Sequence, residues 1–318
     1  MRVLVAGVTG VLGVPLVGRL IAEGHEVAGL CRTHRRTSTV EALGVRAVVA
    51  DALDGSAVRS AVVGARPDAI VHALTALPPR GPLRAADLNA TNALRVTGTR
   101  NLLAAAIAAG TRRLVVESMV FVYGFGDLGD APLTEDGPTA RRVPKRWLQP
   151  SIDALVSKET QVHDATSAGH IDGVVLRFGG FYGPGTGFDT MVEMLRRRAL
   201  PFVSHARSRG VPWIHIDDAV SAVVAALQHG QPGSTYNIVD DRPAPAGELI
   251  RHLAREVGAP QPWSVPGWVM RLSAPFVATA WLDTTLIVSN AKAKRELGWA
   301  PQFPTYREGI AQQLRLRQ

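Results

Sequence analysis

The stretch that decides the fold is Arg2-Val3-Leu4-Val5-Ala6-Gly7-Val8-Thr9-Gly10-Val11-Leu12-Gly13, at the start of the chain. An apolar, β-rich run leads into three glycines, and a helical pattern then continues to near Gly24. A strand, a glycine-rich turn and a helix in this order cradle the phosphates of a dinucleotide. Gly7 permits the tight turn, Gly10 lets a pyrophosphate approach the backbone, and Gly13 lets the helix lie close to the strand. The unpaired N–H groups at the start of the helix would bind the anion.

Three arginines, Arg32, Arg35 and Arg36, follow the second predicted strand, His25–Cys31. In sites that bind NAD, an acidic residue at this strand end holds the ribose 2′-hydroxyl. Guanidinium groups suit a 2′-phosphate instead, because they donate to its oxygens in a fork. The sequence therefore favours NADP(H) over NAD(H), with solvated loop arginines as the alternative interpretation.

Composition restricts the class of protein. The chain has 318 residues, 46% of them hydrophobic and 19% charged, and its net charge of +8 comes mainly from arginine. No basic block or basic–aromatic motif points to nucleic acid. The single cysteine, Cys31, excludes an internal disulfide and fits a reducing cytoplasm. We expect a cytoplasmic protein with a small-molecule substrate, without a signal peptide, a membrane span or a metal site.

Strands and helices alternate through the first half of the chain, which predicts a parallel sheet with right-handed crossovers. We therefore predict an α/β fold: a Rossmann, doubly wound parallel sheet with a smaller C-terminal substrate-binding lobe. Residues 1–178 would form the dinucleotide-binding domain, with 212–240 returning to it, and 179–211 and 241–318 would form the lobe. The other predicted strands are 46–50, 68–73, 113–117, 173–177, 213–216 and 235–239, and the clearest helices are 92–109, 217–227 and 246–257.

Three of the six tryptophans, Trp263, Trp268 and Trp281, fall in one Pro/Trp-rich part of the predicted lobe. We expect them to pack in its core, because large aromatic side chains are mostly structural. A hydrophobic wall over the substrate and a subunit contact are the alternatives.

Further motifs occur along nearly the whole chain: Asp51-Ala52-Leu53-Asp54, Val71-His72-Ala73-Leu74, Gly98-Thr99-Arg100-Asn101-Leu102-Leu103, Val122-Tyr123-Gly124, Leu176-Arg177-Phe178-Gly179-Gly180-Phe181-Tyr182-Gly183-Pro184, Ile214-His215-Ile216-Asp217-Asp218-Ala219 and Glu296-Leu297-Gly298-Trp299-Ala300-Pro301. Together with the glycine turn, they resemble the extended short-chain dehydrogenase/reductases, often called NAD-dependent epimerase/dehydratases. Members of this family are often dimers through two helices of the main domain, so the resemblance also implies a homodimer.

The resemblance implies a nicotinamide cofactor held at the strand ends. Asp51 would accept a hydrogen bond from the adenine amino group, and Phe178, Gly180 and Phe181 would lie beside the nicotinamide. The full predicted cofactor site comprises Gly7, Thr9, Gly10, Val11, Leu12, Gly13, Arg32, Arg35, Arg36, Asp51, Ala52, Leu53, Ala73, Leu74, Thr75, Lys158, Phe178, Gly180 and Phe181.

Three further residues are expected to be structural. We expect His72 to be a buried core imidazole and Asp54 to cap a helix. Asp218 would cap its own helix and tie the two parts of the chain together.

The proton-transfer half of the family's site is incomplete. A Tyr-x-x-x-Lys pair is the family pattern, in which Lys holds the nicotinamide ribose and lowers the pKa of Tyr, the proton carrier. Lys158 matches the Lys, but Ala154 occupies the Tyr position, and Met119 occupies the usual hydroxyl position on the fifth strand. Arg95 replaces a family Asn, for which Asn92 could substitute. Ser118, Tyr123, Tyr182, Asp153 and Lys158 itself are the replacement candidates, and a water in the space left by Ala154 is another.

Three functions stay open at this point. The chain could be an NADP-dependent oxidoreductase with a displaced acid, or one whose substrate accepts hydride without a strong acid, such as an iminium or a conjugated carbonyl. It could be a cofactor-using epimerase, dehydratase or cyclase with room for a bulky substrate. It could also be a sensor that binds NADP without catalysis.

The long segment 124–148 would shape the substrate pocket. It carries Arg141, Arg142, Lys145 and Arg146. These side chains suit a nucleotide-sugar or other anionic substrate, and a solvated basic loop is the equal alternative.

Overall fold

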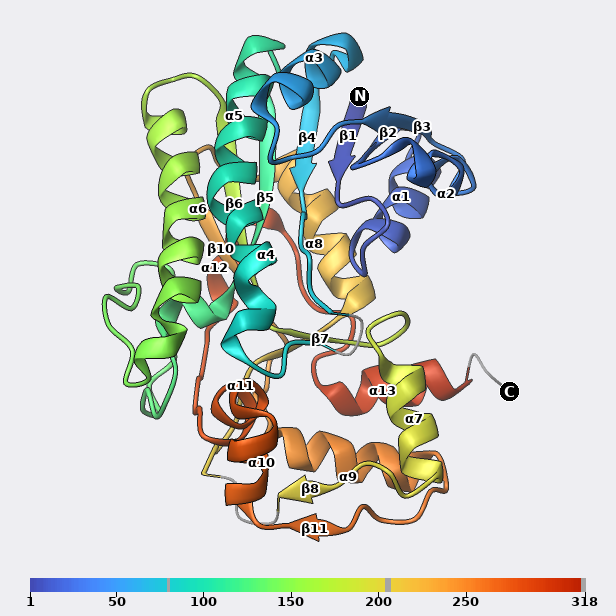
Figure 1. Cartoon of the computed structure of the whole chain (residues 1–318), viewed down its shortest axis with the longest axis vertical. Coiled ribbons are helices and arrows are strands. Elements are labelled where there is room, and N and C mark those ends of the chain that lie inside the picture. Colours follow the sequence, from blue (N-terminus) through green and yellow to red (C-terminus); the bar gives the residue numbers. More distant parts are fainter. Residues whose placement is uncertain (79–80, 204–206, 316–318) are drawn as a thin grey trace.

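A seven-stranded parallel sheet forms the centre of the larger part of the molecule, in the order β10-β6-β5-β4-β1-β2-β3 (Figure 1). This computed structural model describes residues 1–78, 81–203 and 207–315, so residues 204–206 and 316–318 of the predicted lobe lie outside the described residues. The strands are β1 (Arg2–Ala6), β2 (Glu26–Cys31), β3 (Arg46–Val49), β4 (Ala69–His72), β5 (Arg113–Met119), β6 (Asp172–Phe178) and β10 (Thr235–Ile238). The predicted doubly wound sheet is confirmed.

Helices cover both faces of this sheet, and the strand residues alternate between them. On β1, Val3 and Val5 belong to one apolar core and Leu4 and Ala6 to the other. Burial on both faces explains why these strands are almost continuously apolar. The first core lies against α1 (Gly13–Ala22), α2 (Thr37–Glu41), α8 (Ile216–His229) and α12 (Ala291–Leu297), and the second against α3 (Gly55–Ala65), α5 (Thr99–Ala108) and α6 (Gln149–Ser167).

The long helix expected over 92–109 is longer than predicted and interrupted. It begins as α4 (Asn89–Ala93), passes through a π-helical turn, η3 (Leu94–Gly98), and continues as α5. Gly110, with a φ of +67°, follows its end. π-Turns inside helices often occur at functional sites, because the extra residue redirects side chains. Here the turn contains Arg95.

The smaller lobe lies at the bottom of Figure 1, below the carboxyl ends of β1 and β4. The strand β9, expected to return to the large sheet with 212–240, pairs with β7 outside it, whereas α8 and β10 do return. The lobe elements are β7 (Gly180–Tyr182), α7 (Phe188–Arg196), β8 (Phe202–Val203), β9 (Trp213–His215), α9 (Ala246–Glu256), β11 (Ser264–Val265), α10 (Gly267–Ser273), α11 (Pro275–Val277) and α13 (Tyr306–Arg315).

The expectation that three lobe tryptophans pack in the core is right for one of them. Trp281 stacks on Trp213 with ring centroids 4.7 Å apart. Trp263 and Trp268 are 55% and 62% exposed, so the expectation is wrong for them. Trp268 lies on α10, a short helix on which no described residue is fully buried.

Asp218 ties the chain together but does not cap its helix. The cap of α8 is His215, whose side chain accepts from the backbone N–H of Asp217. The buried carboxylate of Asp218 instead accepts from the backbone N–H groups of Gln302 and Phe303, at 2.7 and 3.0 Å. The predicted tie is therefore correct, and the predicted cap is wrong.

We predict that replacing Gly13 by Ala destabilises the fold, because a Cβ there would lie 2.2 Å from the carbonyl oxygen of Gly7. Overpacking of this kind costs about 1–3 kcal/mol. Gly18 in the same helix is the matched control: no described atom comes within 4 Å of its added Cβ. Gly18→Ala should stabilise by up to about 1 kcal/mol, since Ala favours helices. Urea unfolding measures both free energies, and equal values for the two variants would contradict the packing argument.

Candidate cofactor and active site

The carboxyl ends of the parallel strands bring the predicted cofactor residues to one edge of the sheet. Gly7, after β1, has a φ of +101°, and a Cβ on it would lie 2.3 Å from the carbonyl oxygen of Ala73, after β4. Only glycine therefore permits the turn and its contact with the neighbouring strand. The N–H of Gly10 donates to the carbonyl oxygen of Gly7 at 2.9 Å, which closes the turn.

The amino end of α1 is free to receive an anion. No described side chain caps this helix, and its first turn has no acidic residue. The positive end of the helix dipole favours a phosphate there, although the N–H of Val14 already donates to the carbonyl oxygen of Gly10 and Pro15 has no N–H. Thr9 and Val11 are exposed at this end, and Leu12 is buried behind it. The turn and the helix end together fit the pyrophosphate of a dinucleotide.

The residues predicted to hold the adenosine half lie on neighbouring strand ends. Asp51 folds its carboxylate back to accept from the N–H of Leu53 at 3.0 Å, beside the buried Ala52. Leu74 is half-buried after β4 and Thr75 is exposed. Arg32, Arg35 and Arg36 are exposed after β2, and none forms an ion pair with a described residue. Their charges are available to a ligand at this edge.

Two residues expected to be structural are confirmed as such. Asp54 caps α3 by accepting from the N–H groups of Ser56 and Ala57, both at 3.0 Å. His72 is fully buried, with Nε2 2.8 Å from the hydroxyl of Thr99, while its Nδ1 accepts from the N–H of Leu74. Burial, reinforced by the nearby Lys158 charge, holds the pKa of His72 well below its usual value, so this imidazole is neutral.

Lys158 lies inside the protein and is paired. Its Nζ donates to Glu117 Oε2 at 2.9 Å, and the two side chains are 0% and 7% exposed. Burial lowers the pKa of Lys158, and the Glu117 carboxylate opposes that shift. Glu117 was not among the predicted site residues. A charged residue inside the apolar run Leu114-Val115-Val116-Glu117 was the signal for it, since buried carboxylates need a partner.

Ser118 also belongs to a buried ion-pair network. Its hydroxyl donates to Glu159 Oε1 at 2.6 Å, and Arg177 pairs with the same carboxylate, its Nη2 lying 2.6 Å from Oε2. Both charged side chains are 5% exposed. Ser118 is itself fully buried, so this geometry gives it a structural role and does not bring it to a substrate.

The Tyr123 hydroxyl is likewise engaged. It receives a hydrogen bond from Arg177 at 2.9 Å and lies 3.0 Å from two acceptors, the Asn237 Oδ1 atom and the Thr134 carbonyl oxygen. Burial raises the pKa of Tyr123. A phenol with these contacts is a structural crosslink between β6, β10 and the segment after β5.

Tyr182 lies in the lobe. Its ring is 4% exposed and packs edge-on against His215, and its hydroxyl donates to the carbonyl oxygen of Thr305 at 3.3 Å. Burial, reinforced by the Asp240 carboxylate, raises the pKa of Tyr182 above its usual value. It belongs to the same apolar cluster as Tyr306 and Ile310, so the structure does not bring it together with Lys158.

Three buried residues lie in a row on one face of α6. Ser151, Ala154 and Lys158 are all buried and are spaced by three and four residues. Asp153 points the other way: it is exposed and accepts from Gln149. Ala154 therefore lies between two hydrogen-bonded residues of α6: Ser151, which pairs with Asn92, and Lys158, which pairs with Glu117.

Aromatic side chains gather next to this face. Ile152 and Leu155 of α6 share an apolar cluster with Phe121, and Trp281 packs against that cluster. The Phe121 and Trp281 rings meet edge to face, with centroids 5.5 Å apart. This cluster, beside Ile152 and Leu155 of α6, is thus suited to pack against a flat, apolar group.

One of the predicted nicotinamide residues, Gly180, contacts this aromatic group. Phe178 is fully buried with its ring centroid 5.3 Å from that of the half-buried Phe181. A Cβ on Gly180 would lie 2.4 Å from the Trp281 ring, so only glycine fits there. These residues link β6 to the tryptophan stack of the lobe.

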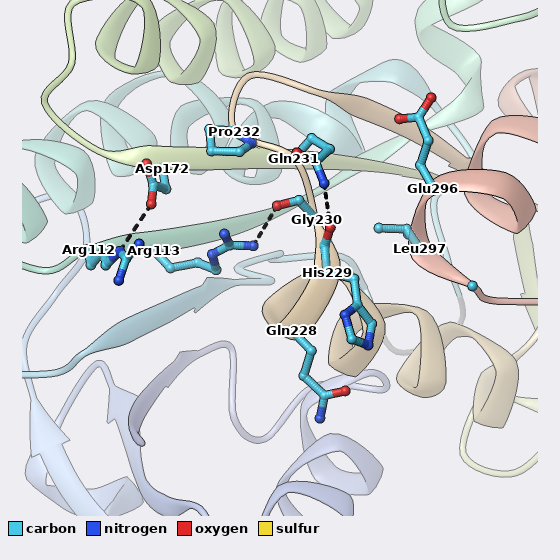
Figure 2. Close-up of a pocket in the computed structure, with 11 residues that line it drawn as sticks. Arg112, Arg113, Asp172, Gln228, His229, Gly230, Gln231, Pro232, Glu296 and Leu297 are labelled. Atoms are coloured by element: carbon cyan, nitrogen blue, oxygen red, sulfur yellow. Dashed lines mark hydrogen bonds and ion pairs between the residues drawn. The ribbon is translucent and has the colours of Figure 1, made fainter.

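A separate cavity of about 720 Å³ lies at the opposite edge of the sheet (Figure 2). It opens beside Arg112 and Arg113, at the start of β5, and Asp172, at the start of β6. Arg113 is already engaged there by the carbonyl oxygens of Ala226 and Gly230, both at 2.8 Å. Since ligands of open α/β sheets bind at the carboxyl ends of the strands, we do not take this cavity as the active site.

The basic segment before α6 faces solvent. Arg141, Arg142 and Arg146 are exposed, and Lys145 donates to the hydroxyl of Thr279 at 2.8 Å.

Among the described residues, no group of three or more His, Cys, Asp or Glu side chains could hold a metal ion. No described helix combines the length and apolar character needed to cross a membrane.

Comparison with known proteins agrees with this geometry. The sequence model of the NAD dependent epimerase/dehydratase family matches residues 3–239, and the chain belongs to that family. A nicotinamide cofactor and an oxidoreductase-type enzyme are thereby supported, and the glycine cradle described above fits such a cofactor.

Two curated relatives are reductases. A 3-diazoavenalumate denitrifying reductase from a Streptomyces species is 38% identical over 98% of this chain and 100% of that protein. A 2-alkyl-3-oxoalkanoate reductase from Stenotrophomonas maltophilia is 29% identical over 82% of this chain and 77% of that protein. Among solved structures, a UDP-glucose 4-epimerase from Thermotoga maritima has a TM-score of 0.80 at 18% identity, covering 100% of this chain and 99% of that chain, which shows the shared fold.

We predict that replacing Glu159 by Gln costs about 3 kcal/mol of unfolding free energy, because Arg177 would stay buried without its anion. Glu193→Gln is the matched control, since Glu193 pairs with Arg197 on the surface of α7, where the side chains are 58% and 74% exposed. A pair of that kind contributes about 0.5 kcal/mol or less. Urea denaturation compares the two variants, and similar losses would show that the buried network is not a structural anchor.

Proposed function

We propose that this protein is an NADPH-dependent reductase that delivers hydride to an electrophile requiring no proton from the enzyme, and that its substrate is an aromatic diazonium carboxylate. The observation that carries the proposal is the pairing of a complete cofactor cradle with Ala154 at the position of the family's proton-donating Tyr. The other hydroxyl candidates do not replace that Tyr, because Ser118 and Tyr123 are engaged in buried networks.

The curated relative that is 38% identical over nearly the whole chain supports the substrate class. Its name describes a diazo compound as the substrate and the removal of nitrogen as the reaction. The aromatic pair of Phe121 and Trp281, which packs in one cluster with Ile152 and Leu155 of α6, favours an aryl group.

The chemistry of such a substrate explains why no acid is needed. The nicotinamide cofactor supplies a hydride when bound. An arenediazonium cation takes up hydride at its terminal nitrogen, and the neutral aryl diazene then loses N2 while its N–H hydrogen passes to the ring carbon. One cation and one hydride give one arene and one N2, so no further proton enters. A carbonyl would instead become an alkoxide, for which general acid catalysis is typically worth about 10²–10⁴-fold.

The chain's own residues take the remaining roles. Lys158 holds the nicotinamide ribose, as the resemblance implies, and its ion pair with Glu117 keeps the ammonium charged in a buried position. Ala154 places a methyl group where the family's phenol would stand. Aromatic rings in the turn after β5 and in the lobe would exclude water, which otherwise converts a diazonium group to a phenol.

The preference for NADP(H) is part of this proposal. Arg32, Arg35 and Arg36 are exposed after β2 and lack ion-pair partners among the described residues, which suits a 2′-phosphate. A cytoplasmic location and a homodimer stay predictions of the sequence.

A second candidate is an epimerase or dehydratase acting on a nucleotide sugar. The exposed Arg141, Arg142 and Arg146 before α6 are the observation that favours it, because they could meet a diphosphate. That reaction would need another group to exchange the proton that the missing Tyr handles.

The reaction is tested by mixing the protein with NADPH and a ¹⁵N-labelled 4-carboxy-substituted arenediazonium salt, and following ¹⁵N2 by mass spectrometry. We expect one N2 and one reduced arene for each NADPH oxidised. Omitting NADPH should leave only slow conversion to the phenol. Oxidation of NADPH without N2 release, or no oxidation at all, would contradict the proposal.

We predict that Arg32→Asp raises the Kd of NADPH about 10-fold, because a charge-assisted contact is replaced by repulsion. The Kd of NADH should change less than about 2-fold. Arg46→Asp is the control, since it makes the same charge change at an exposed position at the start of β3, on the opposite edge of the sheet. Fluorescence titration gives both constants, and an unchanged NADPH/NADH ratio in Arg32→Asp would remove Arg32 from the site.

A further inference from the structure

Arg95 is a buried cation that the reaction described above does not use. It lies in the π-helical turn η3 and is 7% exposed. Its Nη1 donates to Asn92 Oδ1 at 3.1 Å, while its Nε is buried with no hydrogen-bond partner among the described residues. A guanidinium stays charged in proteins, and a buried charge with an unsatisfied donor is costly unless a ligand completes it.

The charges around Arg95 do not balance. Glu117 is the carboxylate that acts electrostatically on it, and that carboxylate is already in contact with Lys158 at 2.9 Å. Glu159 is nearby but is held by Arg177. His72, which lies near the Lys158 charge, is neutral. Two cations thus share one anion, which leaves one net positive charge inside the protein.

The position of Arg95 places this charge beside Ala154. Asn92, which holds the guanidinium, donates to Ser151 of α6 at 3.2 Å. Ser151 precedes Ala154 by one helical turn, and Lys158 follows it by one turn on the same face. The two cations therefore flank the position where the family's phenol would stand. The dinucleotide pyrophosphate belongs to the amino end of α1 beside β1, so it does not neutralise them.

We propose that Arg95, together with Lys158, binds a carboxylate of the substrate beside Ala154. The carboxylate would supply the anion that the buried cluster lacks and would complete the hydrogen bonding of Arg95 Nε. Arg suits this role because its fork donates two parallel hydrogen bonds to a carboxylate. Binding at this point would hold the attached aromatic ring against Phe121 and Trp281. The proposal rests on the proposed function for the class of substrate, and it assigns the recognition of that substrate's acid group.

The test uses binding, not turnover, with 4-hydroxycinnamate and its methyl ester as probes. Calorimetry is performed on the protein saturated with NADP⁺. The unaltered protein should bind the acid at least about 10-fold more tightly than the ester, since a charge-assisted contact is lost in the ester. An ester that binds as tightly as the acid, or an acid that does not bind at millimolar concentration, overturns the proposal without any variant.

Variants then assign the effect to Arg95. Arg95→Gln should weaken acid binding about 10- to 100-fold and ester binding less than about 2-fold, with Arg95→Lys in between. Arg112→Gln is the control, since Arg112 is 87% exposed at the opposite edge of the sheet and should change neither affinity. Equal weakening of acid and ester, or an unchanged acid affinity, would overturn the assignment. Urea midpoints and the NADPH Kd show whether each variant is folded and still binds cofactor.

The result of this binding test can be distinguished from the result of the N2-release test. If Arg95-dependent binding of the acid is found but no N2 is released from a diazonium salt, the anion site stands and the proposed reaction is wrong. If N2 is released but acid and ester bind alike, the reaction stands and the anion site is wrong.

Discussion

The close approach of three backbone segments at the carboxyl edge of the sheet governs the rest of this structure. Gly7 lies against the carbonyl of Ala73, and Gly13 lies against the carbonyl of Gly7, at distances that leave no room for a Cβ. This contact fixes β1, β4 and α1 relative to one another. It also aims the amino end of α1 into the space between neighbouring strand ends, where a dinucleotide phosphate fits. The positions of the other site residues follow from their strands.

Next to that glycine turn, buried charged side chains form ion pairs. Lys158 with Glu117 and Arg177 with Glu159 are buried between α6 and the ends of β5 and β6. Each pair is costly to break, because the remaining partner would be a buried, unpaired charge. The two ion pairs therefore fix the position of α6 relative to the sheet. The Arg177–Glu159 pair also forms hydrogen bonds with Ser118 and Tyr123, whose hydroxyls would otherwise have been available for proton transfer.

The sequence predicted the fold well, because apolar runs and glycine turns report on local geometry. All seven strands of the main sheet were located to within one or two residues, and the Asp54 cap and the buried His72 were correct. The partners of buried charges were harder to predict, since they depend on which residues the topology brings together. Ser118 pairs with Glu159 across 41 positions of sequence, and Tyr123 meets Asn237 across 114. The pairing of β9 with β7 and the exposure of Trp268 likewise depend on tertiary packing.

The central claim is that hydride transfer in this site proceeds without a proton donor at position 154. The most direct measurement compares Ala154→Tyr with Ala154→Phe, which adds the ring without the hydroxyl, on an aromatic aldehyde and an arenediazonium salt of the same size. We expect that Tyr alone raises aldehyde reduction, by about 10²–10⁴-fold, and that neither variant accelerates loss of N2. Faster loss of N2 with Tyr than with Phe, or aldehyde reduction by the unaltered protein as fast as by Ala154→Tyr, would contradict it.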